Sequence, residues 1–140
     1  MEKALESNPK FHFAWNNLGL TLNDLGRKSE ALTAFETALE IDPKFHMAWN
    51  GLGNVLRDLG HKSEAIAAFN QALEIDPKFH FAWNNLGSTL NNLGHKSEAI
   101  AAFETALEID PKFHFSWNGL GSTLNDLGRY TEAIAALEKA

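Results

Sequence analysis

Histidines recur at a fixed spacing and are the first residues to consider for metal chemistry. Four of them stand 34 residues apart, at His12, His46, His80 and His114. Neighbouring packed helices lie about 8–10 Å apart, which is too far for such residues to share one ion through Zn–N bonds of about 2 Å. No two histidines are separated by four residues, and the chain contains no cysteine. We therefore expect no metal site and no cofactor.

The serines and aspartates do not suggest catalysis. They recur at expected helix caps and turns, and no glycine-rich phosphate loop is present. We therefore expect that the protein is not an enzyme.

Asparagines also recur at the 34-residue spacing, at Asn16, Asn50, Asn84 and Asn118. Each amide offers a hydrogen-bond donor and an acceptor on a short side chain. A row of such amides can hydrogen-bond the backbone of an extended peptide whatever side chains the peptide carries. The alternative is that these residues only solvate an exposed helix, although asparagine is a poor helix former.

Residues 80–113 represent one 34-residue repeat and predict two helices. Apolar residues with helical spacing are Trp83, Leu86, Leu90 and Leu93, and then Ala99, Ile100, Phe103, Ala106 and Leu107. Gly94 can end the first helix in the left-handed conformation, and Ser97 is predicted to cap the second. Pro111 closes the repeat because it cannot donate a backbone hydrogen bond.

These residues resemble the tetratricopeptide repeat. The pattern of that family is W-x₂-L-G-x₂-Y, then A-x₃-F, then P, at a period of 34. The third copy carries it at Trp83, Leu86, Gly87, Leu90, Ala99, Phe103 and Pro111. Leucine replaces the family tyrosine in all four copies, and Leu137 replaces the last phenylalanine. The resemblance implies an all-α solenoid of antiparallel helix pairs that forms a right-handed superhelix.

The repeat period divides the chain without a linker, and we expect a single domain over residues 1–140. Residues 1–11 match the tail of a preceding repeat, and complete repeats span 12–45, 46–79 and 80–113. A fourth, truncated repeat spans 114–140. The near-identical copies suit a segment of a longer natural array or an engineered array. Apolar end faces predict head-to-tail self-association.

In the resembled family the first helix of each repeat lines a concave face, which implies where a ligand binds. The implied amide and charged residues are Asn16, Asn50, Asn84 and Asn118, then Asn23, Arg57, Asn91 and Asn125, together with Asn54. The implied apolar residues are Phe13, Met47, Phe81 and Phe115. The related series at Phe11, Phe45, Phe79 and Phe113 is interpreted instead as packing between repeats.

The sequence departs from two known ways in which members of the family bind their ligands. The carboxylate clamp for chaperone C-termini needs basic residues where this chain has Phe81 and Asn85, or Phe115 and Gly119. We therefore expect that the chain does not bind chaperone C-termini in this way. Arrays of the glycosyltransferases that attach N-acetylglucosamine carry an inward asparagine ladder. Here Asn17 and Asn85 alternate with glycines, which breaks that ladder.

Composition limits the class of partner. The 140 residues carry a net charge of −6, which argues against nucleic acid as a ligand. No apolar run approaches the roughly 18 residues of a membrane span, and no signal peptide opens the chain. We expect a cytoplasmic protein that binds a protein or peptide. The alternatives are a structural or self-associating array without a ligand, and a substrate-recruiting segment of a larger glycosyltransferase.

Overall fold

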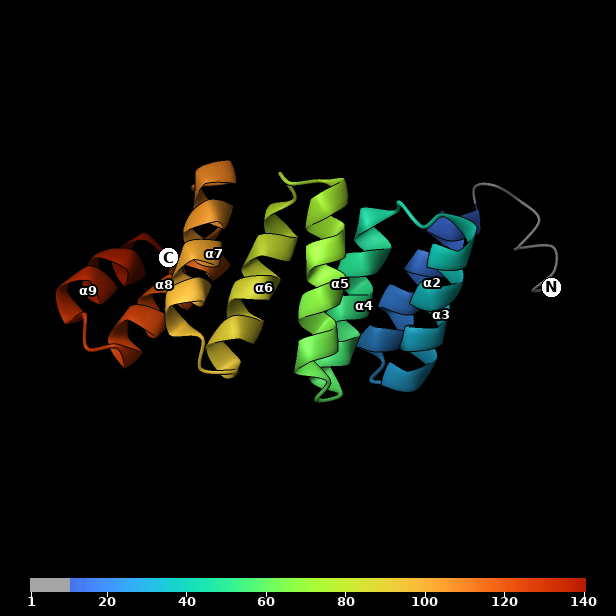
Figure 1. The fold of residues 1–140 in the computed structure, drawn as a ribbon, viewed down its shortest axis with the longest axis horizontal. Helices are drawn as coiled ribbons and strands as arrows, with labels where there is room; N and C mark the ends of the chain where they lie inside the picture. The colour runs from blue at the N-terminus through green and yellow to red at the C-terminus, as the bar shows by residue number, and fades with distance from the viewer. Residues whose placement is uncertain (1–10) are drawn as a thin grey trace. The chain divides into compact units, whose positions relative to one another are not determined.

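The computed structural model describes residues 11–140, and within this range all regular structure is helical. The helices are α2 (Phe11–Asp24), α3 (Lys28–Ile41), α4 (His46–Asp58), α5 (Lys62–Ile75), α6 (His80–Asn92), α7 (Lys96–Ile109), α8 (His114–Asp126) and α9 (Tyr130–Lys139). They belong to two compact units, Met1–Asp76 and Pro77–Ala140. Figure 1 shows α2–α5 in blue to green and α6–α9 in yellow to red. The predicted tail of a preceding repeat lies outside the described residues except for Phe11.

Consecutive helices form antiparallel pairs in both units. The pairs are α2 with α3, α4 with α5, α6 with α7, and α8 with α9. In the first unit α3 packs on α4, and α2 also contacts α4, whereas α3 makes no comparable contact with α5. The second unit repeats this arrangement with α7 on α8 and α6 on α8. The first helices therefore form one layer of each unit and the second helices the other, which confirms the predicted all-α fold of repeated helix pairs.

The turn within a repeat is a glycine-dependent motif that ends one helix and starts the next. Gly94 has φ +85°. Its N–H donates to Asn91 O at 3.0 Å, and the N–H of His95 donates to Leu90 O at 2.9 Å, which is the Schellman pattern. Helix α7 then starts at Lys96, with His95 at the N-cap and no side-chain capping bond. The prediction that Ser97 is the N-cap is wrong, because this tight turn places Ser97 inside the helix.

A phenylalanine between two glycines forms the centre of each unit. Phe35 of α3 is fully buried. A Cβ atom added at Gly19 of α2 would lie 2.8 Å from this ring, and one added at Gly51 of α4 would lie 2.5 Å from it. In the second unit, Phe103 is held in the same way between Gly87 and Gly119. Three helices can approach one ring this closely only because both flanking residues lack a side chain.

The tryptophans of three repeats are fixed by the loops that precede them. The indole Nε1 of Trp49 donates to Pro43 O at 2.8 Å. Trp83 makes the equivalent bond to Pro77, and Trp117 to Pro111. These bonds connect the tryptophan of the repeat pattern to the proline at the end of the preceding repeat. Each of these three indoles is half-buried.

Candidate peptide-binding face

The candidate face lies on α2 and α4 in the first unit and on α6 and α8 in the second. Counted from the histidine that begins each repeat, the predicted residues stand at positions 2, 5, 9 and 12, and this helical spacing places them on one side of each helix. Their burial and partners differ from one repeat to the next.

The main asparagine row changes from buried to exposed along the chain. Asn16 is only 5% exposed, Asn50 and Asn84 are half-buried, and Asn118 is exposed. In the second unit Ser116 Oγ of α8 donates to Asn84 Oδ1 of α6 at 2.9 Å. Asn84 thus connects two first helices, and its amide N–H₂ remains the group that could meet a ligand.

Two amide oxygens of the first unit are buried without a hydrogen bond. They are Asn16 Oδ1 on α2 and Asn54 Oδ1 on α4, and neither accepts a hydrogen bond from any residue within 11–140. A buried acceptor without a partner costs about 1–3 kcal/mol. Rotating either amide toward a peptide N–H would recover that free energy. These are the least satisfied polar groups on the candidate face of this unit.

The second asparagine row takes part in a bridge that the sequence reasoning missed. Lys96 Nζ of α7 donates to Asn91 Oδ1 at 2.7 Å and lies 3.0 Å from Asp126 Oδ2 of α8. Lys28 makes the equivalent contacts with Asn23 and Asp58 in the first unit. The oxygens of Asn23 and Asn91 are therefore engaged within the protein. The sequence does carry a signal for this bridge, because Lys28 and Lys96 each stand 30 residues before the aspartate that they contact.

The other two members of that row have different surroundings. Arg57 is half-buried, with its Nε 3.5 Å from Asp58 Oδ1. Asn125 is exposed, and Tyr130 occupies the position of the bridging lysine in its repeat. The row therefore does not present four equivalent amides.

Phe13 and Met47 form the aromatic strip of the first unit, at the start of α2 and α4, and Phe81 and Phe115 form that of the second unit, at the start of α6 and α8. Each of these side chains is about half exposed, from 46% to 58%. The rings of Phe13 and Phe81 also pack against phenylalanines of the loops. The ring centroids of Phe13 and Phe45 are 5.0 Å apart, and those of Phe81 and Phe113 are 5.2 Å apart. Of the series interpreted as packing between repeats, Phe45 is buried, whereas Phe11, Phe79 and Phe113 are half-buried. The strip combines fixed positions with open apolar surface.

The recurring histidines lie beside carboxylates and aromatic rings. His12 Nε2 is 3.7 Å from Asp42 Oδ2, and the equivalent pairs are His46 with Asp76 and His80 with Asp110. Each contact becomes an ion pair when the imidazole is protonated. Within residues 11–140 no group of three or more His, Cys, Asp or Glu side chains is arranged to hold a metal ion.

Across the same range, no helix combines the length and apolar character needed to cross a bilayer.

Comparison with known proteins identifies both sequence and structural relatives. Three family models described as tetratricopeptide repeat match residues 24–78, residues 80–113, and residues 1–33 with 102–135. The comparison with curated proteins found no match. Among solved structures, MamA is 25% identical with a TM-score of 0.85, covering 98% of this chain and 80% of its own.

Two further solved structures share the fold. Residues 41 to the end of MamA from Desulfovibrio magneticus RS-1 are 22% identical with a TM-score of 0.81, covering 94% of this chain and 73% of that one. The first repeat domain of Spaghetti (RPAP3), bound to the HSP90 peptide SRMEEVD, is 19% identical with a TM-score of 0.80. That match covers 84% of this chain and 93% of the other.

Proposed function

The chain belongs to the tetratricopeptide repeat family, and on that premise we propose that it is a non-catalytic scaffold that binds an extended peptide. The ligand lies along the first helices, on α2 with α4 and on α6 with α8. The backbone of the peptide is recognised by the asparagine amides, and its apolar side chains contact the aromatic strip.

The observation that carries this proposal is the pair of unsatisfied amide oxygens in the first unit. Asn16 Oδ1 and Asn54 Oδ1 have no intramolecular donor within residues 11–140. Buried polar groups are normally hydrogen-bonded, so such groups point to a partner that the isolated chain lacks. The N–H groups of an extended peptide offer that partner once the amides rotate outward.

The aromatic strip supports an apolar component of the ligand. Phe13 and Met47 are half exposed on the helices that carry the two amides, and Phe81 and Phe115 have similar exposure in the second unit. Exposed apolar groups that are held in place by packing favour binding, because little side-chain entropy is lost. The fold also holds a peptide in the Spaghetti (RPAP3) structure, which supports a peptide as the class of ligand.

A peptide array tests the proposal. Unrelated extended peptides with alternating apolar residues are screened against the protein and against a variant with Asn16, Asn50, Asn84 and Asn118 all changed to Ala. We expect the variant to lose at least tenfold in affinity across all sequences, because a backbone contact does not depend on peptide side chains. Circular dichroism checks that the variant remains helical.

A matched control removes an amide elsewhere. Asn70 is exposed on α5, away from the candidate face, and Asn70→Ala should bind peptides as the parent does. If the fourfold variant and the parent bind the same peptides with the same affinity, the amide mechanism is refuted. If Phe81→Ser abolishes binding only of peptides with apolar side chains, the aromatic strip makes the protein selective for such peptides.

Self-association is a second candidate function, favoured by the exposed apolar surface of α9. Ile134 is 60% exposed, although its equivalent Ile100 in α7 is 8% exposed. On α2, Leu18 is also exposed, although its equivalent Leu52 is buried. These side chains occupy opposite sides of the contact that joins successive repeats, so they are complementary and a head-to-tail contact would propagate.

Sedimentation velocity over a wide concentration range distinguishes this candidate. We expect concentration-dependent association that Ile134→Lys reduces, whereas Ala135→Lys, at an exposed neighbouring position, should leave more of it intact. A monomer at every concentration for the parent protein would exclude the candidate.

A further inference from the structure

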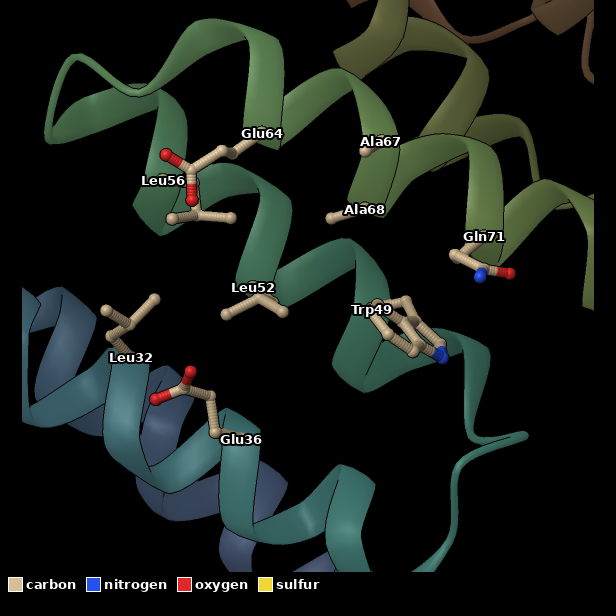
Figure 2. A pocket seen from close by; sticks show the side chains of 9 residues that line it. All are labelled: Leu32, Glu36, Trp49, Leu52, Leu56, Glu64, Ala67, Ala68 and Gln71. Carbon is tan, nitrogen blue, oxygen red and sulfur yellow. The ribbon is translucent and has the colours of Figure 1, made fainter.

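A second groove lies on the opposite side of α4 from the candidate peptide-binding face. It measures about 440 Å³ and lies between α3, α4 and α5 (Figure 2). Trp49, Leu52 and Leu56 of α4 form its floor, and Glu36 of α3 and Glu64 of α5 contribute carboxylates. Repeat positions 4, 7 and 11 supply the floor, whereas positions 2, 5, 9 and 12 supply the peptide-binding face, so the two surfaces are separate.

The second unit contains the same groove with one informative difference. Each lining residue of the first groove has an equivalent 68 residues later that lines a groove between α7, α8 and α9. Trp49 corresponds to Trp117, and Glu36 and Glu64 correspond to Glu104 and Glu132. Gln71, however, corresponds to Lys139.

Lys139 places its own ammonium group in the second groove. Its Nζ lies over the Trp117 ring, 4.8 Å from the centroid, which is a cation–π contact. Arg129 also lines this groove, and its guanidinium donates two hydrogen bonds to Glu132. The hydrogen bond from Arg129 lowers the pKa of the Glu132 carboxyl. The negative charge of Glu104 contributes to the raised pKa of the Arg129 guanidinium. Two carboxylates are thus matched by two cations, and the remaining space is about 200 Å³.

The first groove has the same carboxylates without these cations. Gln71 lies near Trp49 where the second groove has Lys139 (Figure 2), and no cation lies over the Trp49 ring among residues 11–140. Glu36 forms no ion pair with another residue in that range. Glu64 has only the exposed His61, at 3.4 Å, where Glu132 has Arg129. The groove is therefore acidic, with an open indole face.

We propose that this groove binds a lysine or arginine side chain from a basic segment of a partner protein. The cation lies over the Trp49 indole, where Lys139 lies over Trp117 in the second unit, and Glu36 and Glu64 balance its charge. The aliphatic part of the side chain packs on Leu52 and Leu56. This interaction is independent of peptide binding on the first helices.

Indole NMR signals of the full chain labelled with ¹⁵N-tryptophan test the proposal. The probe is acetyl-Gly-Gly-Lys-Gly-Gly-amide, compared with the same peptide carrying arginine or the uncharged norleucine. Trp49→Phe and Trp117→Phe variants assign the two relevant signals. We expect the lysine and arginine peptides to shift the Trp49 signal saturably, the norleucine peptide to bind at least tenfold more weakly, and the Trp117 signal to remain unchanged.

Exchanging the residues that differ between the grooves provides matched variants. Gln71→Lys should weaken binding at Trp49 about tenfold, because the groove then holds its own cation, whereas Gln71→Met should bind like the parent. Lys139→Gln with Arg129→His should make the Trp117 signal respond. An equal response to norleucine, or unchanged binding by Gln71→Lys, overturns the proposal.

Discussion

Replacing Gly51 by alanine tests the packing around Phe35. The new Cβ atom would lie 2.5 Å from Phe35 Cε1 and 2.6 Å from Cζ, well inside van der Waals contact. The ring cannot move away, because the other side of it faces Gly19, where a Cβ would lie 2.8 Å away. We therefore expect α3 and α4 to separate, or the ring to leave its preferred rotamer.

The expected loss of stability follows from two opposing terms. Forcing a methyl group into a packed core costs about 1–3 kcal/mol. Alanine in place of glycine within a helix recovers up to about 1 kcal/mol. The net effect of Gly51→Ala is then a loss of about 1–2 kcal/mol in the free energy of unfolding, measured by urea denaturation with circular dichroism. Gly119→Ala should behave similarly, because Phe103 stands in the same arrangement.

Two comparisons separate packing from helix propensity. Asn17 occupies the same repeat position as Gly51 but is exposed, so Asn17→Ala should be neutral or slightly stabilising. In the Gly51→Ala background, Phe35→Leu should cost less than it does in the parent protein, since the smaller side chain relieves the clash. A Gly51→Ala protein as stable as the parent would refute the reasoning.

Three further predictions concern other contacts. Trp83→Ala should lower the free energy of unfolding by about 3 kcal/mol in urea denaturation, because packing and the hydrogen bond to Pro77 are lost. Asn84→Ala should lower it by at most about 1 kcal/mol, through the lost bond from Ser116. Equal losses for the two variants would contradict this prediction. Lys96→Met should cost about 0.5–1 kcal/mol at low salt, and the difference should shrink at 1 M NaCl in the same assay. Gly94→Ala should lower stability by about 1 kcal/mol because of its positive φ, and a neutral effect on thermal unfolding would contradict this.

The helix pairs could be predicted because local signals specify them. The 34-residue period, the glycine of each turn and the proline of each loop define where helices start and stop within a few residues. Ser97 shows the limit of this reasoning: serine is a common N-cap, but the preceding turn is completed by His95, and that geometry depends on backbone hydrogen bonds that sequence does not display.

The candidate site was less predictable, because it depends on contacts between neighbouring helices. A row of identical asparagines suggests identical environments, yet Asn16 is buried and Asn118 is exposed. The bridge from Lys96 to Asn91 and Asp126 needs three helices at fixed separations. The groove at Trp49 likewise depends on side chains from three helices, and only its comparison with the groove at Trp117 reveals the missing cation.

The ring held between two glycines has a consequence for how the protein unfolds. In a linear array, stability is a sum of repeat and nearest-neighbour terms. Phe35 belongs to the first repeat but is enclosed by glycines of the first and second, so neither repeat can open without exposing the same ring. The cooperative element of the first unit is therefore the repeat pair, and Phe103 makes the second unit a cooperative element of the same size.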